Sequence, residues 1–420
     1  MSIYDQVWDV VVIGGGAAGL MAATSAADRG RNVLLLEKNR KLGVKILMSG
    51  GTRCNITHDC GPKEIAAAIG ENGRFLYPAL GTLPPCQVIQ MIESCDVPTK
   101  IETTGKIFPA SDRALDVRDA LVSLAESAGA HLKPLHPVTQ ITSDGASFKM
   151  ETDQGDVNAR RVILTTGGKS YPGCGTTGDG YTWAGQFGHT IVPPVAALTP
   201  IRTTDAWPRE LSGMTIAKAG VSVADPVGER PTQPPRILDH CNDSMLFTHF
   251  GFSGPAVLNV SRTVNLHDSP NRLQLNLDFV CDQTPDQFRS TFQDHLIANG
   301  KSSIGNLIMD YVPRRLVHCL LDRSGVLPAT RAAELNRDQT NRLMSELKSA
   351  SFPISGTLGF KKAEVTAGGI AVDEIDPKTM ESKLCPGLFL AGEVIDIDGP
   401  IGGYNFQAAF STGWLAGQHA

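Results

Sequence analysis

A glycine-rich turn between an apolar strand and a helix constrains the fold of this chain more than any other feature. Residues 7–13 (VWDVVVI) form an apolar, β-branched run, which predicts a buried strand. Gly14, Gly16 and Gly19 follow it with the spacing G-x-G-x-x-G, and 17–29 reads as a helix with small residues on one side. This order of strand, glycine turn and helix is the start of a dinucleotide-binding Rossmann unit.

The glycines and a following acidic residue have separate tasks in such a unit. Gly14 makes the tight turn, Gly16 lets the backbone approach a pyrophosphate, and Gly19 lets the helix pack closely on the strand. A second predicted strand, 32–36, ends at Glu37, about 20 residues after the turn. The Glu37 carboxylate can accept hydrogen bonds from ribose hydroxyls, and the phosphates would meet the unpaired N–H groups at the start of the helix. We therefore predict a dinucleotide site at the N-terminal end of the chain.

Size and composition are typical of a globular chain. The 420 residues suffice for two or three domains, and 41% are hydrophobic and 19% charged. A formal net charge of −5 argues against a surface that coats nucleic acid. No apolar run reaches the ~20 residues of a membrane span, and the first strand begins too early for a signal peptide. We therefore predict no membrane association. The nine cysteines contain no C-x-x-C pair and no cluster has metal-ligand spacing, so we also predict no metal and a cytoplasmic location.

The character of the sequence changes twice along the chain. From about residue 192 prolines become frequent and short β-type segments lie between them, which indicates a small inserted β domain. A helical stretch with breaks at Pro285, Pro313 and Gly325 follows. The predicted domains are a nucleotide-binding domain (1–191 and 360–420), an inserted β domain (192–282 and 349–359) and a helical subdomain (283–348).

The C-terminal end of the chain returns to nucleotide-binding chemistry. Residues 387–392 predict a short strand, Glu393 follows it, and a glycine-rich turn at 396–407 runs into a helix at 408–417. A glycine-rich turn at a helix N-terminus is a second site for an anion or ligand. An extended FAD spans about 20 Å and needs both ends held, whereas an enzyme that binds only NAD has less need of this distant element. The two ends of the chain together therefore favour FAD as the cofactor.

Five blocks of the sequence resemble the HI0933-like family of flavoproteins, whose members are described as NAD(P)/FAD-dependent oxidoreductases or aminoacetone oxidases. Together the blocks span nearly the whole chain. They are VVIGGGAAGLMAA at 11–23, KLGVKILMSGGTRCNIT at 41–57, GGKSYPGCGTTGDGYTWAGQFGHTI at 167–191, LFTHFGFSGPAVLNVSR at 246–262 and AGEVIDIDGPIGGYNFQAAFSTG at 391–413. One departure is Thr52, where the family commonly has glycine, and we expect a slightly stiffer loop there.

The resemblance implies an α/β fold: a Rossmann-like FAD-binding domain built from both chain ends, with an inserted β-barrel-like domain and a small helical domain. It also implies that FAD is bound non-covalently. The family positions at the adenosine end are Gly14, Gly16, Gly19, Glu37 and Lys38. Those near the flavin are Lys45, Ser49, Gly50, Arg53, Cys54, Asn55, Gly392, Glu393, Asp396, Gly402, Gly403, Tyr404, Asn405 and Gln407. The predicted cofactor site is completed by Ala17, Ala18, Val138, Thr166, Gly167 and Gly168.

Three of these residues, Cys54, Lys45 and Tyr404, are candidates for a catalytic role. Cys54 could donate a proton to a substrate carbon after hydride has arrived from flavin N5, or it could be a small buried thiol without chemistry. Lys45 could lie beside the N1–C2=O edge of the flavin or pair with a phosphate, unless it is simply solvated. Tyr404 lies in the turn that presents backbone N–H groups at the start of the C-terminal helix, whose positive end would stabilise negative charge on the flavin.

Arg53, Tyr171 and His249 are further candidates, each with a structural alternative. Arg53 could neutralise the pyrophosphate or a substrate anion, or it could stabilise its own loop. Tyr171 could line the substrate cavity or belong to a crossover into the inserted domain. His249 could transfer a proton near neutral pH, although a hydrogen-bonded structural histidine is the simpler interpretation.

We expect an FAD-dependent oxidoreductase that transfers hydride between flavin N5 and an electron-poor C=C or C=N of a small molecule, with NAD(P)H as reductant. We expect the substrate between the flavin and the inserted domain. The resemblance implies reduction of conjugated alkenes, with steroid-like enones and the uracil ring of ribosomal RNA as targets. RNA would need a basic face, for which the candidates are Arg272, Arg314, Arg315, Lys361 and Lys362. Two alternatives are an RNA- or protein-binding module with structural FAD and an oxygen-using amine oxidase.

Overall fold

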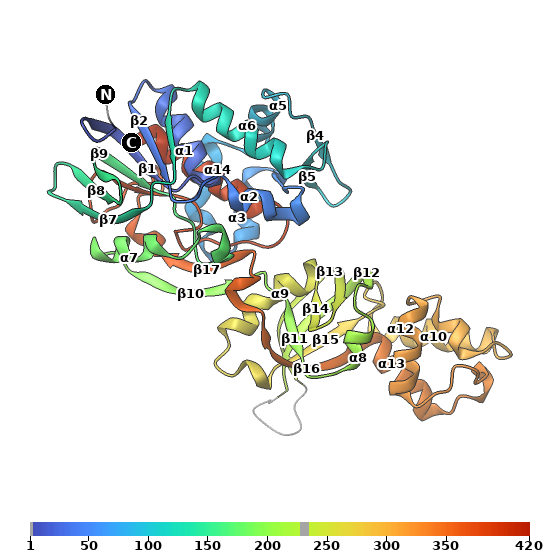
Figure 1. Ribbon diagram of the computed structural model, residues 1–420. Helices are drawn as coiled ribbons and strands as arrows, with labels where there is room; N and C mark the ends of the chain where they lie inside the picture. Colours follow the sequence, from blue (N-terminus) through green and yellow to red (C-terminus); the bar gives the residue numbers. More distant parts are fainter. Residues whose placement is uncertain (1–2, 227–234) are drawn as a thin grey trace. The chain divides into compact units, whose positions relative to one another are not determined.

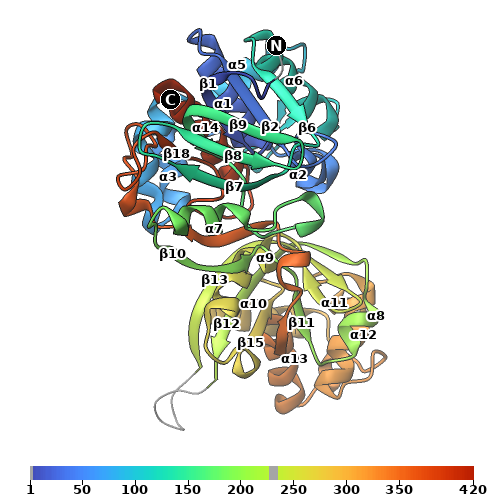
Figure 2. The same ribbon diagram turned by 60° about the vertical axis from the view of Figure 1, so that its left-hand side comes forward.

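The chain folds into two compact units in a computed structural model that describes residues 3–226 and 235–420 (Figure 1 and Figure 2). The first unit comprises Met1–Ala196 and Ala363–Ala420, and the second comprises Ala197–Lys362. Each unit has its own hydrophobic core. Residues 227–234 of the predicted inserted β domain lie outside the described residues, and the predicted boundary between that domain and the helical subdomain stays a prediction.

A sheet of seven strands forms the centre of the first unit (Figure 2). Its path is β6-β2-β1-β9-β8-β7, and β18 pairs with the end of β9. The pairs β6–β2, β2–β1, β1–β9 and β9–β18 are parallel, whereas β8 is antiparallel to β9 and to β7. The strands are β1 (Val7–Ile13), β2 (Val33–Glu37), β6 (His131–Pro134), β7 (Val138–Ser143), β8 (Phe148–Thr152), β9 (Gly155–Leu164) and β18 (Leu388–Leu390).

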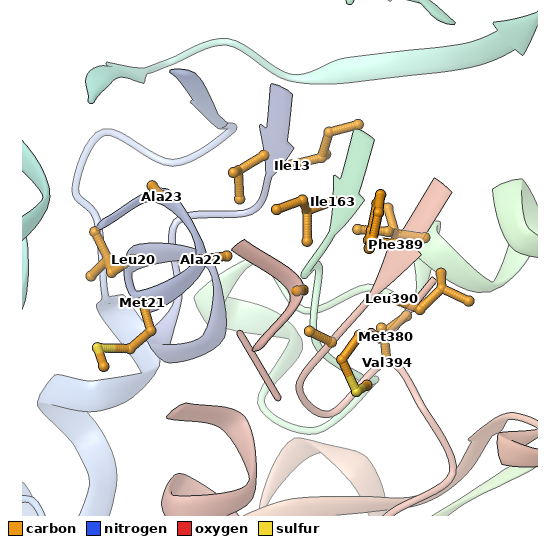
Figure 3. Close-up of a cluster of buried hydrophobic side chains, with 14 of the residues drawn as sticks. Ile13, Leu20, Met21, Ala22, Ala23, Ile163, Met380, Phe389, Leu390 and Val394 are labelled. Atoms are coloured by element: carbon orange, nitrogen blue, oxygen red, sulfur yellow. The ribbon is translucent and has the colours of Figure 1, made fainter. Parts of the chain in front are cut away.

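Helices α1 (Ala17–Asp28), α14 (Tyr404–His419) and α6 (Ala114–Ser127) belong to the same unit as this sheet. The inner strands β1, β2 and β18 are apolar along most of their length, as expected for strands covered on both faces, and every residue of β2 is buried. Figure 3 shows part of the core that results, in which Leu20 and Met21 of α1, Ile13 of β1, Ile163 of β9 and Phe389 of β18 contribute to one apolar cluster.

Two smaller sheets complete the first unit. One has the order β3-β5-β4, and the other pairs β10 with β17. Their strands are β3 (Thr57–His58), β4 (Thr99–Ile101), β5 (Lys106–Pro109), β10 (Ile191–Ala197) and β17 (Val365–Ile370). The remaining helices are α2 (Val44–Met48), α3 (Pro62–Ile69), α4 (Tyr77–Thr82), α5 (Pro85–Glu93) and α7 (Asp179–Gln186).

The second unit is a closed six-stranded barrel with helices, and its barrel and helical residues share one apolar core. The barrel order is β11 (Ile201–Thr203), β14 (Gly251–Ser253), β13 (Arg236–Thr248), β12 (Thr215–Asp225), β15 (Gln274–Asp278) and β16 (Ala350–Thr357). The helices are α8 (Trp207–Glu210), α9 (Pro255–Leu266), α10 (Pro285–Ala298), α11 (Ile304–Ile308), α12 (Arg314–Ser324) and α13 (Arg337–Ser349). The predicted fold class, a Rossmann-type domain with a barrel and helical segments, is confirmed.

Short 3₁₀ helices lie at several connections between these elements. They are Ser49–Thr52, Glu71–Leu76, Pro172–Cys174, Pro270–Arg272, Ala332–Glu334, Gly359–Lys361 and Val372–Glu374. The local sequence explains where several of the longer helices begin. In α10, for example, Pro285 occupies the first helical position, and Thr284 and Gln287 form a reciprocal capping box.

Candidate functional site

The predicted adenosine site lies at the carboxyl edge of the sheet in the first unit. Because β1, β2, β9 and β18 run in the same direction, the loops that follow them leave from one edge. Those loops begin with Gly14, Lys38, Thr165 and Ala391. β1 stands between β2 and β9, so the connections diverge beside Gly14. This switch point is where doubly wound sheets bind nucleotides.

The three fingerprint glycines fit their predicted tasks. Gly14 has a φ of +106°, and a Cβ atom there would lie 2.6 Å from the carbonyl oxygen of Thr165. A Cβ at Gly19 would lie 1.9 Å from the carbonyl oxygen of Gly14, so only glycine lets α1 pack on the turn. A Cβ at Gly16 would meet no atom within 4 Å. Since the chain itself leaves this space open, the residues fit a pyrophosphate that approaches the backbone at Gly16.

Glu37 stands at the end of β2, as predicted, and its side chain is buried. Its Oε2 accepts a hydrogen bond from the Gly15 N–H at 2.7 Å, and its Oε1 accepts one from the Asn39 N–H at 2.7 Å. The backbone thus orients the carboxylate, and each oxygen keeps a lone pair for a ribose hydroxyl. The next residue, Lys38, forms an ion pair with Asp179 at 2.5 Å.

Helices α1 and α14, from the two ends of the chain, pack so closely that two glycines of α14 have no room for a side chain. A Cβ added to Gly413 of α14 would lie 2.2 Å from the carbonyl oxygen of Ala18 in α1, and one added to Gly417 would lie 2.4 Å from that of Ala22. A Cβ at Gly392, after β18, would lie 2.7 Å from the Ala18 side chain. The C-terminal helix is therefore held directly against the helix that begins at the fingerprint, as a two-ended cofactor site requires.

The glycine-rich turn before α14 depends on glycine at two positions. Gly402 and Gly403 have φ of +151° and +90°, and a Cβ at Gly403 would lie 2.5 Å from the backbone of Thr57. The hydrogen-bond network orients the Asn55 amide so that its oxygen accepts from the Gly403 N–H at 3.0 Å and its nitrogen donates to the carbonyls of Thr57 and Ile107. The loop that contains Asn55 and the start of α14 are thereby joined.

Side chains of α14 itself hold the same turn. The Asn405 Oδ1 accepts from the Gly399 N–H at 2.8 Å, and its Nδ2 donates to the Gly399 carbonyl at 2.8 Å. The His58 ring stacks on Tyr404 with ring centroids 5.0 Å apart, and its Nδ1 lies 3.0 Å from the carbonyl oxygen of Gly402. Burial, followed by the nearby Cys60, raises the pKa of Tyr404. The turn is therefore preorganised before any ligand binds.

Lys45 is the centre of a polar network at the same edge of the sheet. Its Nζ donates to Glu393 Oε2 at 2.5 Å and to Ser170 Oγ at 2.7 Å. Ser170 Oγ donates to Glu393 Oε1 at 2.7 Å, and the Thr366 N–H donates to that oxygen at 2.8 Å. The carboxylate and the ammonium group thus fix each other. Contact of Lys45 or Glu393 with a flavin stays a prediction.

The loop after α2 contains a run of left-handed residues. Gly50, Gly51, Thr52 and Cys54 have φ of +54°, +67°, +71° and +62°. Glycine adopts this region without strain, whereas a β-branched residue does not. The expectation of a stiffer loop at Thr52 thus has a physical basis, because threonine stands where glycine would be unstrained.

Arg53 and Cys54 occupy different environments in this loop. The Arg53 guanidinium donates to Glu102 at 2.7 Å and lies 4.0 Å above the centre of the Phe108 ring, an arrangement that stabilises the loop. Cys54 is fully buried, and burial raises the pKa of its thiol to about 12. The thiol therefore stays protonated at neutral pH. The Ser49 hydroxyl donates to the carbonyl of Ile46 within α2 at 2.7 Å.

Other predicted cofactor residues have structural contacts of their own. Gln407 is fully buried and accepts from the Thr57 hydroxyl at 2.7 Å, and the Asp396 carboxylate accepts from Asn72 at 3.1 Å. Ala17 is the first residue of α1, Val138 begins β7, and Gly167 has a φ of +71°. A Cβ at Gly168 would lie 2.3 Å from the Thr366 hydroxyl, so glycine allows this close approach. Their contacts with FAD stay predictions.

Two buried hydroxyl groups beside the site lack a partner. Among the residues that the structure describes, Thr166 Oγ1 and Tyr181 OH are buried without a hydrogen bond. Burial, together with the charges of Glu393 and Asp396, raises the pKa of Tyr181. Because native proteins seldom leave buried polar atoms unpaired, these hydroxyls are consistent with a site that receives a polar ligand or water.

A second G-x-G-x-x-G, at Gly173, Gly175 and Gly178, precedes α7. Its surroundings differ from those of the fingerprint because the first residue of α7 is Asp179, whose carboxylate pairs with Lys38. A carboxylate at this helix start repels an anion, so the spacing alone does not indicate a second pyrophosphate site.

Sequence reasoning missed Ser170 and Thr366, which contact the Lys45–Glu393 pair, and Glu364, which lies within electrostatic reach of Lys45. Ser170 and Thr366 complete the Lys45–Glu393 network. Their only signals are the runs GGKSY after β9 and AEVTAGG along β17, in which small residues permit close approach.

Residues in the second unit that we considered for substrate chemistry are mostly exposed. His249 is exposed in the hairpin between β13 and β14. Among the predicted basic residues, Arg272 lies 3.4 Å from Asp225, Arg315 donates to the carbonyl of Glu210, and Arg314 is exposed. Within 3–226 and 235–420, no group of three or more His, Cys, Asp or Glu residues could hold a metal ion. In those ranges no helix combines the length and the apolar character of a membrane span.

Solved structures with a similar fold include a ketosteroid dehydrogenase and a flavocytochrome. One is the 3-ketosteroid-delta4-(5alpha)-dehydrogenase from Rhodococcus jostii RHA1, with a TM-score of 0.52 and 16% identity over 99% of this chain and 96% of that one. Another is a flavocytochrome c3 fumarate reductase, with a TM-score of 0.50 and 16% identity over 99% of this chain and 78% of that one. At this identity the likeness concerns the fold alone. The fold and the glycine fingerprint define a protein with a Rossmann-type FAD-binding domain.

Sequence relatives specify the family. The HI0933-like protein Rossmann domain matches residues 8–419. The chain is 33% identical to the ribosomal RNA dihydrouridine synthase of Escherichia coli K12, over 98% of this chain and 97% of the relative. It is 30% identical to the 3-dehydro-bile acid delta(4,6)-reductase of Clostridium scindens, over 97% of this chain and 98% of the relative. The chain therefore belongs to the HI0933-like family, and the resemblance seen in the sequence is confirmed.

Proposed function

We propose that this protein uses FAD to reduce a carbon–carbon double bond that is conjugated to a carbonyl group. The observation that carries the proposal is the site shared by the two chain ends, in which α14 packs on α1 through Gly413 and Gly417. The names of two relatives support the reaction class. Dihydrouridine formation saturates the ring double bond of uracil, and a delta(4,6)-reductase saturates a dienone, so both substrates contain a C=C conjugated to C=O.

The chain's own residues would hold the cofactor at two places. Gly14, Gly16 and Glu37 would bind the pyrophosphate and adenosine, and the turn at Gly402 and Gly403 would bind the other end. When bound, FAD supplies the hydride chemistry. The N-terminal end of α14 stabilises nearby negative charge, and the Lys45 ammonium is held in an ion pair with Glu393 at the same edge of the sheet.

We propose a small enone as the substrate and NAD(P)H as the reductant, with the uracil ring of RNA as the second candidate substrate. The net charge of −5 supports a small molecule over RNA, because RNA binding relies on a basic surface. The RNA candidate rests on the activity for which the Escherichia coli relative is named. The other G-x-G-x-x-G precedes α7, whose first residue, Asp179, would repel a pyrophosphate. A nicotinamide donor would therefore have to reach the flavin without a dinucleotide fingerprint of its own.

Anaerobic reoxidation of the photoreduced, FAD-loaded protein tests the reaction class. The probes are 4-androstene-3,17-dione, 2-cyclohexen-1-one and a uridine-containing RNA, with cyclohexanone as the saturated control. We expect at least one conjugated probe to restore the absorbance of oxidised flavin at about 450 nm, and cyclohexanone to leave the protein reduced. If no conjugated probe reoxidises the flavin faster than buffer, the proposal is wrong.

Two further additions separate the reductant and the alternatives. We expect anaerobic NADH or NADPH to bleach the oxidised protein. Bleaching by a primary amine, followed by rapid recovery in oxygen, would instead identify an amine oxidase. A flavin that none of these compounds reduces or reoxidises would support a structural role for FAD.

A further inference from the structure

The second G-x-G-x-x-G lies in the connection between β9 and α7, and we call residues 170–179 of this connection the clamp loop. Contacts within the protein require two of its glycines. Gly175 has a φ of +90°, and a Cβ atom there would lie 2.5 Å from the Asn39 side-chain nitrogen. Gly178 has a φ of +84°, and a Cβ atom there would lie 2.7 Å from the Lys169 side chain. The glycine spacing therefore serves the close packing of this loop.

Hydrogen bonds within the clamp loop hold it in one shape. The Tyr171 carbonyl accepts from the Cys174 N–H at 2.8 Å and from the Thr176 hydroxyl at 3.0 Å, and the same hydroxyl contacts the Ser170 carbonyl oxygen. Tyr171 has a φ of +53°, a left-handed conformation that a bulky residue seldom adopts, and these bonds maintain it. Because the loop is fixed internally, a displacement of one part of it moves the other part as well.

The second half of the clamp loop holds the segment that follows β2. The Asn39 N–H donates to Glu37 Oε1 at 2.7 Å, and the Asn39 Nδ2 donates to the Cys174 carbonyl at 2.9 Å. Between them in sequence, Lys38 forms its ion pair with Asp179 at 2.5 Å. A shift of the clamp loop would therefore displace the N–H group that orients the Glu37 carboxylate.

The first half of the clamp loop holds the Lys45–Glu393 ion pair. Ser170 is fully buried, and its hydroxyl accepts from Lys45 Nζ at 2.7 Å and donates to Glu393 Oε1 at 2.7 Å. The Cys174 thiol donates to the sulfur of Met48 at 3.1 Å, and Met48 belongs to α2, the helix that contains Lys45. The loop therefore contacts both the ion pair and the helix that carries its cation.

Both groups that the clamp loop holds stand beside the fingerprint turn. Glu37 Oε2 accepts from the Gly15 N–H at 2.7 Å, inside the fingerprint itself. Glu393 follows Gly392, where a Cβ atom would lie 2.7 Å from the side chain of Ala18 in the first turn of α1. The two groups thus flank the place where the pyrophosphate is predicted, one from the side of β2 and one from the side of β18.

We infer that the clamp loop couples the two ends of the cofactor site, with Asn39 as the positioning residue for Glu37 and Ser170 as the positioning residue for the Lys45–Glu393 pair. The inference rests on the proposed function, because it takes FAD as the ligand of both ends. An adenosine that engages Glu37 fixes Asn39 and, with it, the clamp loop. The loop then holds Ser170 and the ion pair in the arrangement that the remainder of FAD meets.

A double-mutant cycle on FAD affinity tests the coupling. The Kd of FAD is measured by titration calorimetry for the wild type, Asn39→Ala, Ser170→Ala and the double variant. Each single variant removes hydrogen bonds on one side of the loop, and we expect each to bind FAD about 5–10-fold more weakly. Because the two sides are coupled, the double variant should lie within about twofold of the weaker single variant, whereas independent sides would lose about 25–100-fold. Asn341→Ala and Ser345→Ala, at exposed positions of α13, should match the wild type.

Amide hydrogen exchange with ADP gives a readout that a merely structural role would not move. ADP carries the adenosine and the pyrophosphate of FAD but no flavin. In the protein without FAD, saturating ADP should slow exchange of the clamp loop and of α2 at least about threefold. In Asn39→Ala that is also saturated with ADP, the protection should be confined to residues 14–19 and 33–37. Equal protection of the clamp loop in both proteins would show that Asn39 does not carry the coupling.

The outcomes separate the inference from the proposed function. If the wild type binds neither FAD nor ADP, the cofactor site and the proposed function fail, and the inference fails with them. If the wild type binds FAD but a single variant matches it, or the double variant shows the product of the single losses, the inference is wrong and the proposed function stands. If the variants do not fold, the wild type decides: saturating ADP that leaves the clamp loop unprotected would refute the coupling.

Discussion

Gly413→Ala tests the packing between the two ends of the chain. In an unhindered helix interior the change would stabilise the protein by about 1 kcal/mol. Here the new Cβ would lie 2.2 Å from the carbonyl oxygen of Ala18 and 2.9 Å from its Cα. The helices would have to separate by about 1 Å to restore an ordinary contact. Because the obstacle is backbone, overpacking should cost about 3 kcal/mol, at the upper end of the usual range.

The net loss of about 2 kcal/mol should lower the unfolding temperature of the first unit by about 4–8 °C, as measured by calorimetry. FAD binding should weaken as well, because the displaced α1 begins at the fingerprint. Gly185→Ala in α7 is the matched control, since its Cβ would meet nothing within 4 Å, and it should gain about 0.5–1 kcal/mol. If both variants were equally stable, the close contact of α1 and α14 would be refuted.

Three further predictions concern single side chains. Glu37→Ala removes the carboxylate predicted to bind the ribose and leaves the buried Gly15 N–H without its acceptor. FAD affinity measured by equilibrium dialysis should therefore fall about 10–100-fold, and an unchanged affinity would contradict the site. Burial lowers the pKa of His189, although Glu374 opposes this shift, so the folded state disfavours protonation of the ring. The contribution of the neutral ring to the free energy of unfolding should be kept above about pH 6.5 and lost as the pH falls below it. Urea unfolding midpoints should fall less at low pH for His189→Gln than for the wild type. Iodoacetamide should label exposed Cys86 in the native protein but Cys54 only after unfolding, and mass spectrometry that found native Cys54 labelled would contradict its burial.

Features contained in one short segment could be predicted from the sequence. Gly14 follows β1, Gly16 caps α1 and Glu37 ends β2, because the spacing of the fingerprint fixes these positions locally. The C-terminal turn was predicted on the same basis. Its helix begins at Tyr404, earlier than the predicted start at residue 408, because Gly403 takes the left-handed conformation of the helix cap. Local spacing thus located both turns, and backbone conformation determined the helix boundary.

Contacts between distant segments could not be predicted. The Lys45–Glu393 pair joins residues 348 positions apart, and Ser170 and Thr366 complete it from two other segments. These contacts depend on the order in which β9, β17 and β18 are placed, which no local pattern specifies. Glu364 carries no motif either, and its raised pKa arises from burial in the folded chain. The least predictable part of the site is therefore its electrostatic environment.

The most direct test of the central claim is the FAD affinity of Gly16→Val. Gly16 has φ −83° and ψ −167°, which valine tolerates, and its Cβ would enter open space. Stability should change by no more than about 1 kcal/mol. We predict that the wild type binds one FAD per chain and that Gly16→Val binds it at least about 100-fold more weakly with a nearly unchanged unfolding midpoint. Equal FAD affinity in the two proteins would show that the pyrophosphate does not lie at the fingerprint turn.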